Sequence, residues 1–233
     1  MLPLADLAPR LRQRLARPLP GFEAHRTMAP FGRGAKPEML SIEGKPRARR
    51  AATLVLLYPL SGPPEASGVG GSGAAAFVLT VRQPTLPAHS GQVSLPGGSL
   101  DGAETPEAAA LREGWEEVGV PPRAPDVLGR LSPLYIPPSN FSVWPVVAAL
   151  DRRPPFVAQE AEVARLVEAP LAELVAPGVR RTAVRPTKLP GLEGREYEVP
   201  AYALAGEEVW GATAMMLAEF AAVVREALGA EDG

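Results

Sequence analysis

The sequence GGSLDGAETPEAAALREGWEEVGV, at residues 97–120, decides the fold of this chain. Its Gly-Gly pair predicts a tight turn. A helix should follow, because Thr105 is suited to the N-cap and Pro106 to the first helical position. Glu107 complements the positive start of such a helix. Gly119 predicts the end of the helix, since glycine is common just past a helix C-terminus.

The predicted helix has an apolar stripe and an acidic side. At about 100° per residue, the stripe consists of Ala108, Leu111, Trp115 and Val118. The carboxylates on the opposite side are Glu113, Glu116 and Glu117. We therefore expect an amphipathic helix whose carboxylates lie away from its apolar stripe.

The carboxylates on this helix destabilise one another. Glu113 and Glu117 are like charges one turn apart, which costs roughly 0.2–0.5 kcal/mol. Both lie near the negative end of the helix dipole, and Arg112, one turn before Glu116, offsets only part of the repulsion. A bound Mg²⁺ or Mn²⁺ would reverse this balance, because both ions prefer oxygen ligands. The alternative is a solvated acidic face, which is what most charge runs are.

The spacing of these residues is more specific than their charge. The stretch reads G-x5-E-x7-R-E-U-x-E-E-x-G-U, where U is an apolar residue. The fixed positions are Gly98, Glu104, Arg112, Glu113, Glu116, Glu117, Gly119 and Val120. This pattern resembles the signature of the Nudix hydrolase family, whose members cleave a diphosphate linked to another moiety. Gly114 departs from it, because the family has an aliphatic or small apolar residue there.

The resemblance implies both a fold and a set of site residues. The fold belongs to the α/β class and is an α/β/α sandwich with a mixed β-sheet. Glu113, Glu116 and Glu117, with the Gly98 carbonyl, are the implied ligands of Mg²⁺ or Mn²⁺. Arg112 is expected to orient these carboxylates rather than touch the substrate.

A second resemblance covers residues 79–98, which read L-T-x-R-x3-L-x2-H-x-G-Q-V-x-L-P-G-G. The matching residues are Leu79, Thr80, Arg82, Leu86, His89, Gly91, Gln92, Val93, Pro96, Gly97 and Gly98. The run is similar to the extra motif of the coenzyme A pyrophosphatase subfamily, with Leu95 where phenylalanine is usual. Arg82, Gln92 and Gly97 are therefore candidate substrate-binding residues, since a cation and an amide beside a glycine turn suit a phosphate or a base edge. A structural salt bridge is the alternative role of Arg82.

Three further site residues lie after the helix. The segment S-N-F-x-V-x-P-V-V, at residues 139–147, is similar to a strand of the subfamily that follows a substrate-side loop. Ser139 and Phe141 are therefore candidate substrate-binding residues. Phe141 or Tyr135 would stack on an adenine, although an isolated aromatic is more often part of the core. Glu162, aligned on the Pro-Leu pair at 170–171, is a candidate metal ligand or water-activating base, and Glu113 is the other candidate base.

The remaining elements are predicted from periodicity and from turn residues. Residues 2–16 have the leucine spacing of a helix, with Asp6 as its cap, whereas residues 17–46 predict irregular chain. The expected strands are residues 52–60, 75–82, 127–131, 141–150 and 196–204, and residues 179–195 predict a basic loop. A last helix is expected at residues 214–228, opened by the W-G-A-T sequence at residues 210–213.

Charge divides the chain at about residue 50. Residues 1–50 carry 11 Lys and Arg against 4 Asp and Glu, whereas residues 51–233 carry 13 against 22. We expect residues 1–50 to form a basic segment with a short helix, appended to a Nudix hydrolase domain at residues 51–233. The basic segment lacks the interleaved aromatics of a nucleic-acid platform, so no nucleic-acid partner is expected. Arg47, Arg49 and Arg50 either face phosphate or are solvated arginines that flank a strand.

Composition favours a cytoplasmic enzyme. The chain has no cysteine, which excludes thiolate catalysis and Cys-ligated zinc. No apolar run approaches the roughly 18–20 residues that span a bilayer, and no signal-peptide layout is present, so no membrane partner is expected. The expected partner is a small nucleotide substrate. The oligomeric state is not fixed by the sequence, which leaves a homodimer open.

Together these patterns predict a metal-dependent pyrophosphohydrolase. Its expected substrate is coenzyme A or acyl-coenzyme A, cleaved to 3′,5′-adenosine bisphosphate and (acyl-)4′-phosphopantetheine, as the subfamily resemblance implies. The alternatives are another Nudix substrate (ADP-ribose, a dinucleotide or an oxidised nucleotide) and a non-catalytic nucleotide-binding sensor.

Overall fold

The structure is a computed structural model, and it describes residues 3–30, 34, 36–60, 73–85, 91–186 and 196–229. Within these ranges the helices are α1 (Leu4–Leu15), α2 (Phe22–His25), α3 (Pro37–Leu40), α4 (Pro106–Val118), α5 (Leu171–Val175) and α6 (Gly211–Ala227), with 3-10 turns η1 (Arg26–Met28) and η4 (Pro137–Ser139). The strands are β1 (Arg49–Pro59), β2 (Ala75–Arg82), β3 (Val93–Ser94), β4 (Gly97–Ser99), β5 (Asp126–Arg130), β6 (Leu134–Ile136), β7 (Phe141–Ala149), β8 (Val163–Pro170), β9 (Arg180–Pro186), β10 (Glu196–Leu204) and β11 (Glu207–Trp210).

A mixed sheet forms the centre of the fold. Its strand order is β3-β2-β1-β7-β5, with β4 on β1, β6 on β7 and β8 on β2. β1 and β7 run parallel, whereas β2 and β4 pair with β1 antiparallel. The predicted α/β class with a mixed sheet is therefore confirmed.

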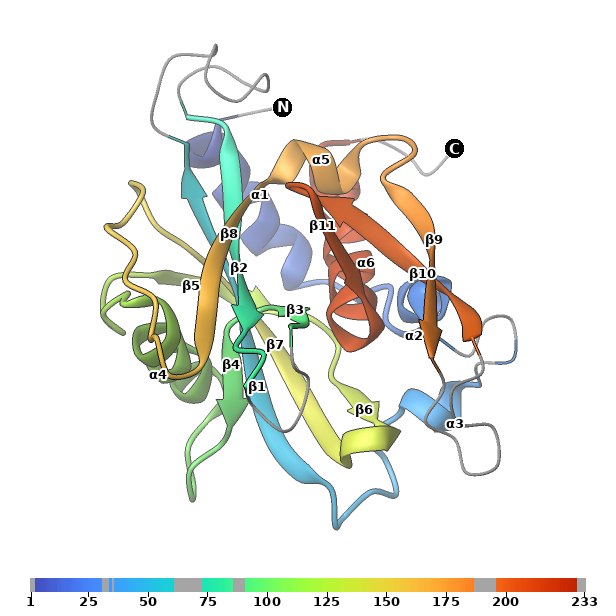
Figure 1. Cartoon of the computed structure of the whole chain (residues 1–233). Coiled ribbons are helices and arrows are strands. Elements are labelled where there is room, and N and C mark those ends of the chain that lie inside the picture. The colour runs from blue at the N-terminus through green and yellow to red at the C-terminus, as the bar shows by residue number, and fades with distance from the viewer. Residues whose placement is uncertain are drawn as a thin grey trace.

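Side chains of β1 alternate between two cores, one on each face of the sheet. Val55 and Leu57 belong to a core that includes residues of α1 and α6. Leu54 and Leu56 belong to a second core that includes residues of α4. Figure 1 shows α4 on one side of the sheet and α1 with α6 on the other. The three layers form the α/β/α sandwich.

The sheet opens at the end where the Gly-Gly pair lies. β1 pairs with β2 only at its far end, where Leu57 is opposite Phe77. At its beginning β1 pairs instead with β4, where Ala52 is opposite Gly98. Gly97 must be glycine, because its φ is +158° and a Cβ there would lie 2.4 Å from the Ala52 carbonyl oxygen. The glycine pair thus occupies the gap between the diverging strands.

α4 begins and ends as predicted, but its apolar stripe was predicted correctly only in part, because Val118 is buried and Leu111 packs against the core whereas Ala108 is exposed. Thr105 caps it by accepting a bond from the Ala108 N–H at 3.2 Å, and Gly119 ends it with φ +77°. Trp115, from the predicted apolar stripe, is 56% exposed. The residues that α4 buries are Pro106, Ala109, Ala110, Gly114, Glu117 and Val118.

Gly114 explains why this other face packs. A Cβ on Gly114 would lie 2.7 Å from Leu54 Cδ2, so its absence lets α4 approach β1 closely. The departure from the family pattern is therefore a packing feature. The close approach turns part of the acidic side of α4 toward the sheet, and the apolar stripe could not predict this.

The N-terminal residues share the core of the sheet. The buried leucines of α1 are Leu4, Leu7, Leu11 and Leu15. Pro3 rather than Asp6 occupies the N-cap of α1, and Asp6 lies in its first turn, so that prediction was wrong. Residues 17–46 contain α2, η1 and α3, so the prediction of irregular chain was wrong for these short elements. The domain division at residue 50 stays a prediction.

A second sheet, in the order β11-β10-β9, lies beside the first. β10 confirms the strand predicted at residues 196–204. The prediction of a loop at residues 179–195 was wrong for residues 180–186, which form β9, and residues 187–195 lie outside the described ranges. α6 begins at Gly211, earlier than expected, because Trp210 ends β11. None of the helices described here has the length and apolarity needed to cross a membrane.

Candidate active site

The glycine corner, which consists of Gly97 and Gly98, is in direct contact with the acidic side of α4. The Gly97 N–H donates a hydrogen bond to Glu117 Oε2 at 3.3 Å. A Cβ on Gly98 would lie 2.4 Å from Glu113 Oε1, so only glycine admits this carboxylate so close to the backbone. The sheet edge and the helix therefore meet at the two carboxylates.

Arg112 holds the carboxylates in place around this corner. Its Nε and Nη2 donate to the two oxygens of Glu104, each at 3.1 Å. Its Nη1 donates to Glu113 Oε1 at 2.9 Å and to Glu116 Oε2 at 3.0 Å, and its Nη2 also donates to the Ser99 carbonyl at 2.9 Å. Such charge-assisted, multidentate bonds fix orientation as well as charge.

Burial disfavours the charged forms of Glu113 and Glu117. Burial first, and then the charges of Glu113 and Glu162, raise the pKa of Glu117 to about 8, against the Gly97 N–H and Arg82, which lower it. Burial also raises the pKa of Glu113, which Arg112 opposes. Two neighbouring carboxylates in such a setting call for a compensating cation.

The donor set fits a hard divalent cation. All the side-chain donors are carboxylate oxygens, which suit Mg²⁺ and Mn²⁺. Within the described residues, however, no three acidic or histidine side chains are already spaced to hold a metal ion. Arg112 engages Glu113 and Glu116 instead, and the Glu116 side chain is 52% exposed. Metal binding at this site therefore requires these side chains to rearrange.

Glu162, predicted from a distant alignment, lies close enough to Glu113 and Glu117 to interact with their charges. These three residues and Glu116 form the carboxylate cluster. Glu162 lies just before β8, and its Oε2 is 3.9 Å from Arg82 Nη1. Its charge also raises the pKa of both Glu113 and Glu117. The structure thus brings a fourth carboxylate, from a separate segment, toward α4.

Arg82 and Gln92 lie together at the end of β2. The Arg82 N–H donates to the Gln92 carbonyl at 3.0 Å. With Glu162 opposite, Arg82 has the structural ion pair that was its alternative role, and it also faces the carboxylate cluster. Leu86 and His89, which complete this part of the motif, lie outside the described residues.

Ser139 and Phe141 lie at a different position along the same end of the sheet. The Arg49 guanidinium lies 4.0 Å from the centre of the Phe141 ring and donates to the Ser139 carbonyl at 3.1 Å. Phe141 is opposite Arg49 on β1, three residues before the Ala52 position that faces Gly98. Phe141 also packs against the core. These two residues are thus separated from the carboxylate cluster along β1.

Comparison with known proteins assigns a family to the part of the chain that carries these residues. The NUDIX domain profile matches residues 69–187, which is half of the chain. The chain belongs to the Nudix family. That range contains α4, the glycine corner and Glu162, so the family assignment and the site rest on the same residues.

Curated relatives match part of this chain. An uncharacterized Nudix hydrolase, NudL, of Cronobacter sakazakii is 47% identical over 98 residues, which is 42% of this chain and 50% of that protein. NudL of Klebsiella pneumoniae is 44% identical over the same shares. This chain thus spans about half the length of the curated relatives that it matches.

Solved Nudix structures are similar at lower levels. RenU, a Nudix hydrolase of M. smegmatis, is 28% identical with a TM-score of 0.43, over 54% of this chain and 73% of that one. A MutT/nudix family protein of Enterococcus faecalis is 20% identical with a TM-score of 0.48, over 78% and 68%.

Several residues around the Nudix site were missed in the sequence. Glu104 occupies a fixed motif position, but its role as the main partner of Arg112 emerges only in the structure. Gln83 and Gln159 hold the segment before Glu162, and no pattern in the sequence marks either of them. Arg50 lies 5.2 Å from the Trp144 ring centre, so two of the three arginines considered for phosphate binding, Arg49 and Arg50, lie over aromatic rings of β7.

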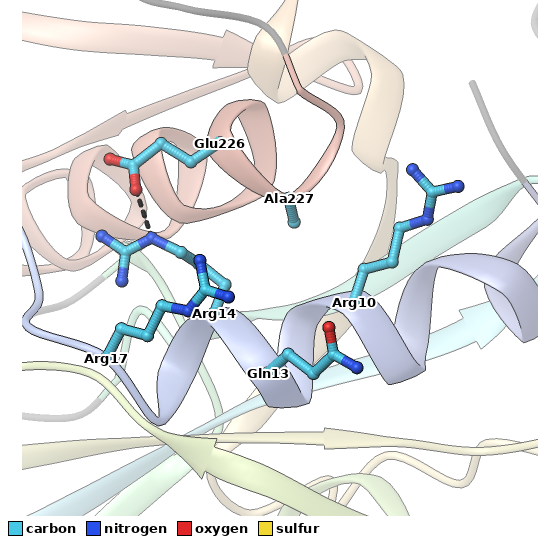
Figure 2. Close-up of a pocket in the computed structure, with 6 residues that line it drawn as sticks. All are labelled: Arg10, Gln13, Arg14, Arg17, Glu226 and Ala227. Atoms are coloured by element: carbon cyan, nitrogen blue, oxygen red, sulfur yellow. Dashed lines mark hydrogen bonds and ion pairs between the residues drawn. The ribbon is translucent and has the colours of Figure 1, made fainter.

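A basic hollow lies apart from the Nudix carboxylates, between α1 and α6 (Figure 2). Its volume is about 300 Å³, and it is lined by Arg10, Gln13, Arg14, Arg17, Glu226 and Ala227. The Arg14 guanidinium forms an ion pair with Glu226, which neutralises part of the positive charge. The carboxylate cluster is on the α4 side of the sheet, so the hollow is no part of it.

Proposed function

We propose that this chain is a metal-dependent hydrolase that cleaves the pyrophosphate bond of a nucleoside diphosphate derivative. The observation that carries the proposal is the contact between the Gly97-Gly98 corner and the carboxylates of α4, with Arg112 orienting them. A polyanionic substrate needs its charge neutralised, and this acidic site attracts it only through a cation. Membership of the Nudix family supports this chemistry.

Each residue of the cluster has a proposed role. Glu113, Glu116 and Glu117, with the Gly98 carbonyl, would hold Mg²⁺ or Mn²⁺, which would supply charge neutralisation for the diphosphate and a more acidic bound water. Arg112 keeps the carboxylates oriented and does not touch the substrate.

The proton of the attacking water goes to Glu162 or Glu113. The water oxygen forms a bond to one phosphorus, and the bond between that phosphorus and the bridging oxygen breaks. The bridging oxygen leaves on the second phosphate, so two phosphate monoesters result. Glu162 is suited to receive the proton because its cationic neighbour, Arg82, lies at 3.9 Å. Glu113, in contrast, already accepts a hydrogen bond from Arg112 at 2.9 Å.

We further propose coenzyme A or acyl-coenzyme A as the substrate. The products are 3′,5′-adenosine bisphosphate and 4′-phosphopantetheine, or its acyl form. Support comes from the resemblance of residues 79–98 to the coenzyme A pyrophosphatase motif, and from the position of Arg82 and Gln92 beside the carboxylate cluster. The two residues supply a cation and an amide at the end of the sheet where the diphosphate binds.

A substrate panel tests both parts of the proposal. Purified protein with Mg²⁺ or Mn²⁺ is assayed on coenzyme A, acetyl-coenzyme A, ADP-ribose, a dinucleotide and an oxidised nucleoside triphosphate, and the products are identified by mass spectrometry. We expect coenzyme A or its acyl form to have the highest kcat/KM. Faster turnover of ADP-ribose overturns the substrate assignment, and tight nucleotide binding without any hydrolysis overturns the enzymatic one.

A further inference from the structure

The connector between β7 and β8, residues 150–162, is hydrogen-bonded to the last turn of α4. The Val157 N–H donates to the Val118 carbonyl, and the Gln159 N–H donates to the Glu117 carbonyl, both at 3.1 Å. The last carbonyls of a helix have no intrahelical partner, so these bonds satisfy groups that would otherwise need water. The segment carrying Glu162 is thereby attached to the turn that carries the metal-binding carboxylates.

Gln83, the residue after β2, fastens the same connector from the other side. Its backbone N–H donates to the Glu162 carbonyl at 2.8 Å. Its side-chain Nε2 donates to the Glu160 carbonyl at 2.8 Å and lies 3.5 Å from the Val163 carbonyl. The backbone bond is open to any residue but proline, whereas the side-chain bond requires a donor of this length.

The pairing of β2 with β8 is irregular next to the connector, where Val81 is opposite Arg165 and Arg82 is opposite Val163, so that β8 has one extra residue. Such bulges redirect side chains next to functional sites. At this position two consecutive residues contact the connector: Arg82 Nη1 lies 3.9 Å from the Glu162 carboxylate, and the Gln83 side chain donates to the Glu160 carbonyl.

We propose that Gln83 is a positioning residue, whose side-chain amide fixes the turn at Glu160 so that Glu162 faces the carboxylates of α4. The inference rests on the proposed function, because it is hydrolysis that gives Glu162 its role. Gln83 acts through Glu162 and does not touch the substrate. Loss of its amide leaves the backbone bonds intact and lets the turn drift, and displacement by about 1 Å costs as much as 100-fold in rate.

Kinetics of a double-mutant cycle test this coupling. Methionine is close to glutamine in length and lacks the donor, so Gln83→Met removes the bond with little change of volume. We expect kcat for coenzyme A with Mn²⁺ to fall about 10- to 100-fold with little change in KM. In a Glu162→Gln background the same substitution should cost almost nothing, because its target is gone. Equal losses in both backgrounds overturn the proposal.

Hydrogen exchange gives a readout that needs no activity. The N–H groups of Glu162 and Val163 donate to the Gln159 carbonyl at 3.0 and 2.8 Å, so they report on the turn. Their exchange should become faster in Gln83→Met and stay unchanged in Gln13→Met, a matched substitution on the exposed face of α1. Unchanged exchange in Gln83→Met overturns the role of Gln83 even in an active enzyme. A wild-type protein that hydrolyses no diphosphate refutes the proposed function separately.

Discussion

At the scale of single residues, Glu117 is the main electrostatic support for a cation at the proposed site. This residue is 8% exposed and interacts with the charge of Glu113, so its charged form is disfavoured by burial and by repulsion. One N–H bond from Gly97 offsets only part of this. A residue that only stabilised the fold would be better uncharged here, which supports a role in binding a metal ion.

Metal affinity should therefore depend on pH in a specific direction. Below its raised pKa of about 8, Glu117 carries a proton in the metal-free protein, and that proton must leave before a metal binds. We expect the affinity for Mn²⁺, measured by calorimetry, to rise about tenfold per pH unit between about pH 6 and about pH 8. In Glu117→Gln binding should be weaker and the slope reduced. An affinity that is independent of pH in the wild type would contradict the assignment.

Removal of the Glu117 charge should separate activity from stability. We expect Glu117→Gln to lower kcat by roughly 100-fold or more, because the cation loses a charged ligand. Because the native pKa is raised, the metal-free wild type loses stability as pH rises from 4.5 toward about 8. The variant lacks this loss, so urea unfolding at the upper end should show it no less stable. Glu107→Gln, in the first turn of the same helix, is the control and should keep its activity.

At the scale of elements, the two glycines of the corner have different roles. A Cβ on Gly98 would meet the Glu113 carboxylate, the mobile end of a long side chain. A Cβ on Gly97 would meet backbone atoms of Ala52 and Thr53, at 2.4 and 2.7 Å, which cannot move away cheaply. One glycine makes room for a functional group and the other for a strand.

This difference predicts that one alanine substitution lowers activity and the other lowers stability. Gly98→Ala should displace Glu113 and lower kcat by roughly 10- to 100-fold with little change in Tm. Gly97→Ala should lower the free energy of unfolding by about 2 kcal/mol or more, because the strand pairing itself is strained. Thermal melts and Mn²⁺-dependent assays of the two variants check this. Equal loss of Tm in both would show that the corner is only structural.

The elements also show what the sequence could and could not predict. The ends of α4 were predictable, because capping at Thr105 and termination at Gly119 depend on local backbone chemistry. Its buried face was not, because Gly114 allows close packing on Leu54 and leaves Trp115 exposed. Helical periodicity describes a helix alone, whereas the sheet decides which side is covered.

The same limit applies to the site. Arg112 and the α4 carboxylates have a fixed spacing in one helix, so their grouping could be predicted from the sequence. The holding of Glu162 depends on contacts between segments far apart in the chain, such as Gln83 with Glu160. No local pattern records such contacts, because they form only when β2 and the connector before β8 meet.

At the scale of the whole molecule, Glu219 of α6 joins segments from different parts of the chain. Its two oxygens accept the Gly21 N–H at 2.8 Å and the Ser132 N–H at 2.9 Å, and His25 Nε2 lies at 3.1 Å. Burial acts to raise the pKa of Glu219, but the bonds from His25, Ser132 and Gly21 outweigh it and hold that pKa below its usual value. The N-terminal residues are thus tied to the last helix.

Stability should depend on this buried carboxylate. Glu219→Gln places an amide against N–H donors and should lower the free energy of unfolding by about 3 kcal/mol at neutral pH. A depressed pKa stabilises the native state above the usual pKa of 4.5 and stops doing so as pH falls through the native value. Urea unfolding should show this acid loss in the wild type and less of it in the variant. Glu226 is also on α6, and Glu226→Gln, which breaks its more exposed pair with Arg14 of α1, should cost less than about 1 kcal/mol.

The packing of α1 makes a final prediction about how the chain folds. Residues 51–233 alone would lack Leu4, Leu7, Leu11 and Leu15, all of which are buried against the sheet and α6. Burial of a leucine side chain contributes about 1.5–3 kcal/mol, so four contribute roughly 6–12 kcal/mol. That is comparable to the whole stability of a typical domain, about 5–15 kcal/mol. We therefore expect the shortened chain to aggregate or to unfold without a cooperative transition. A sharp melt at the Tm of the full chain would show instead that residues 1–50 are an appendage.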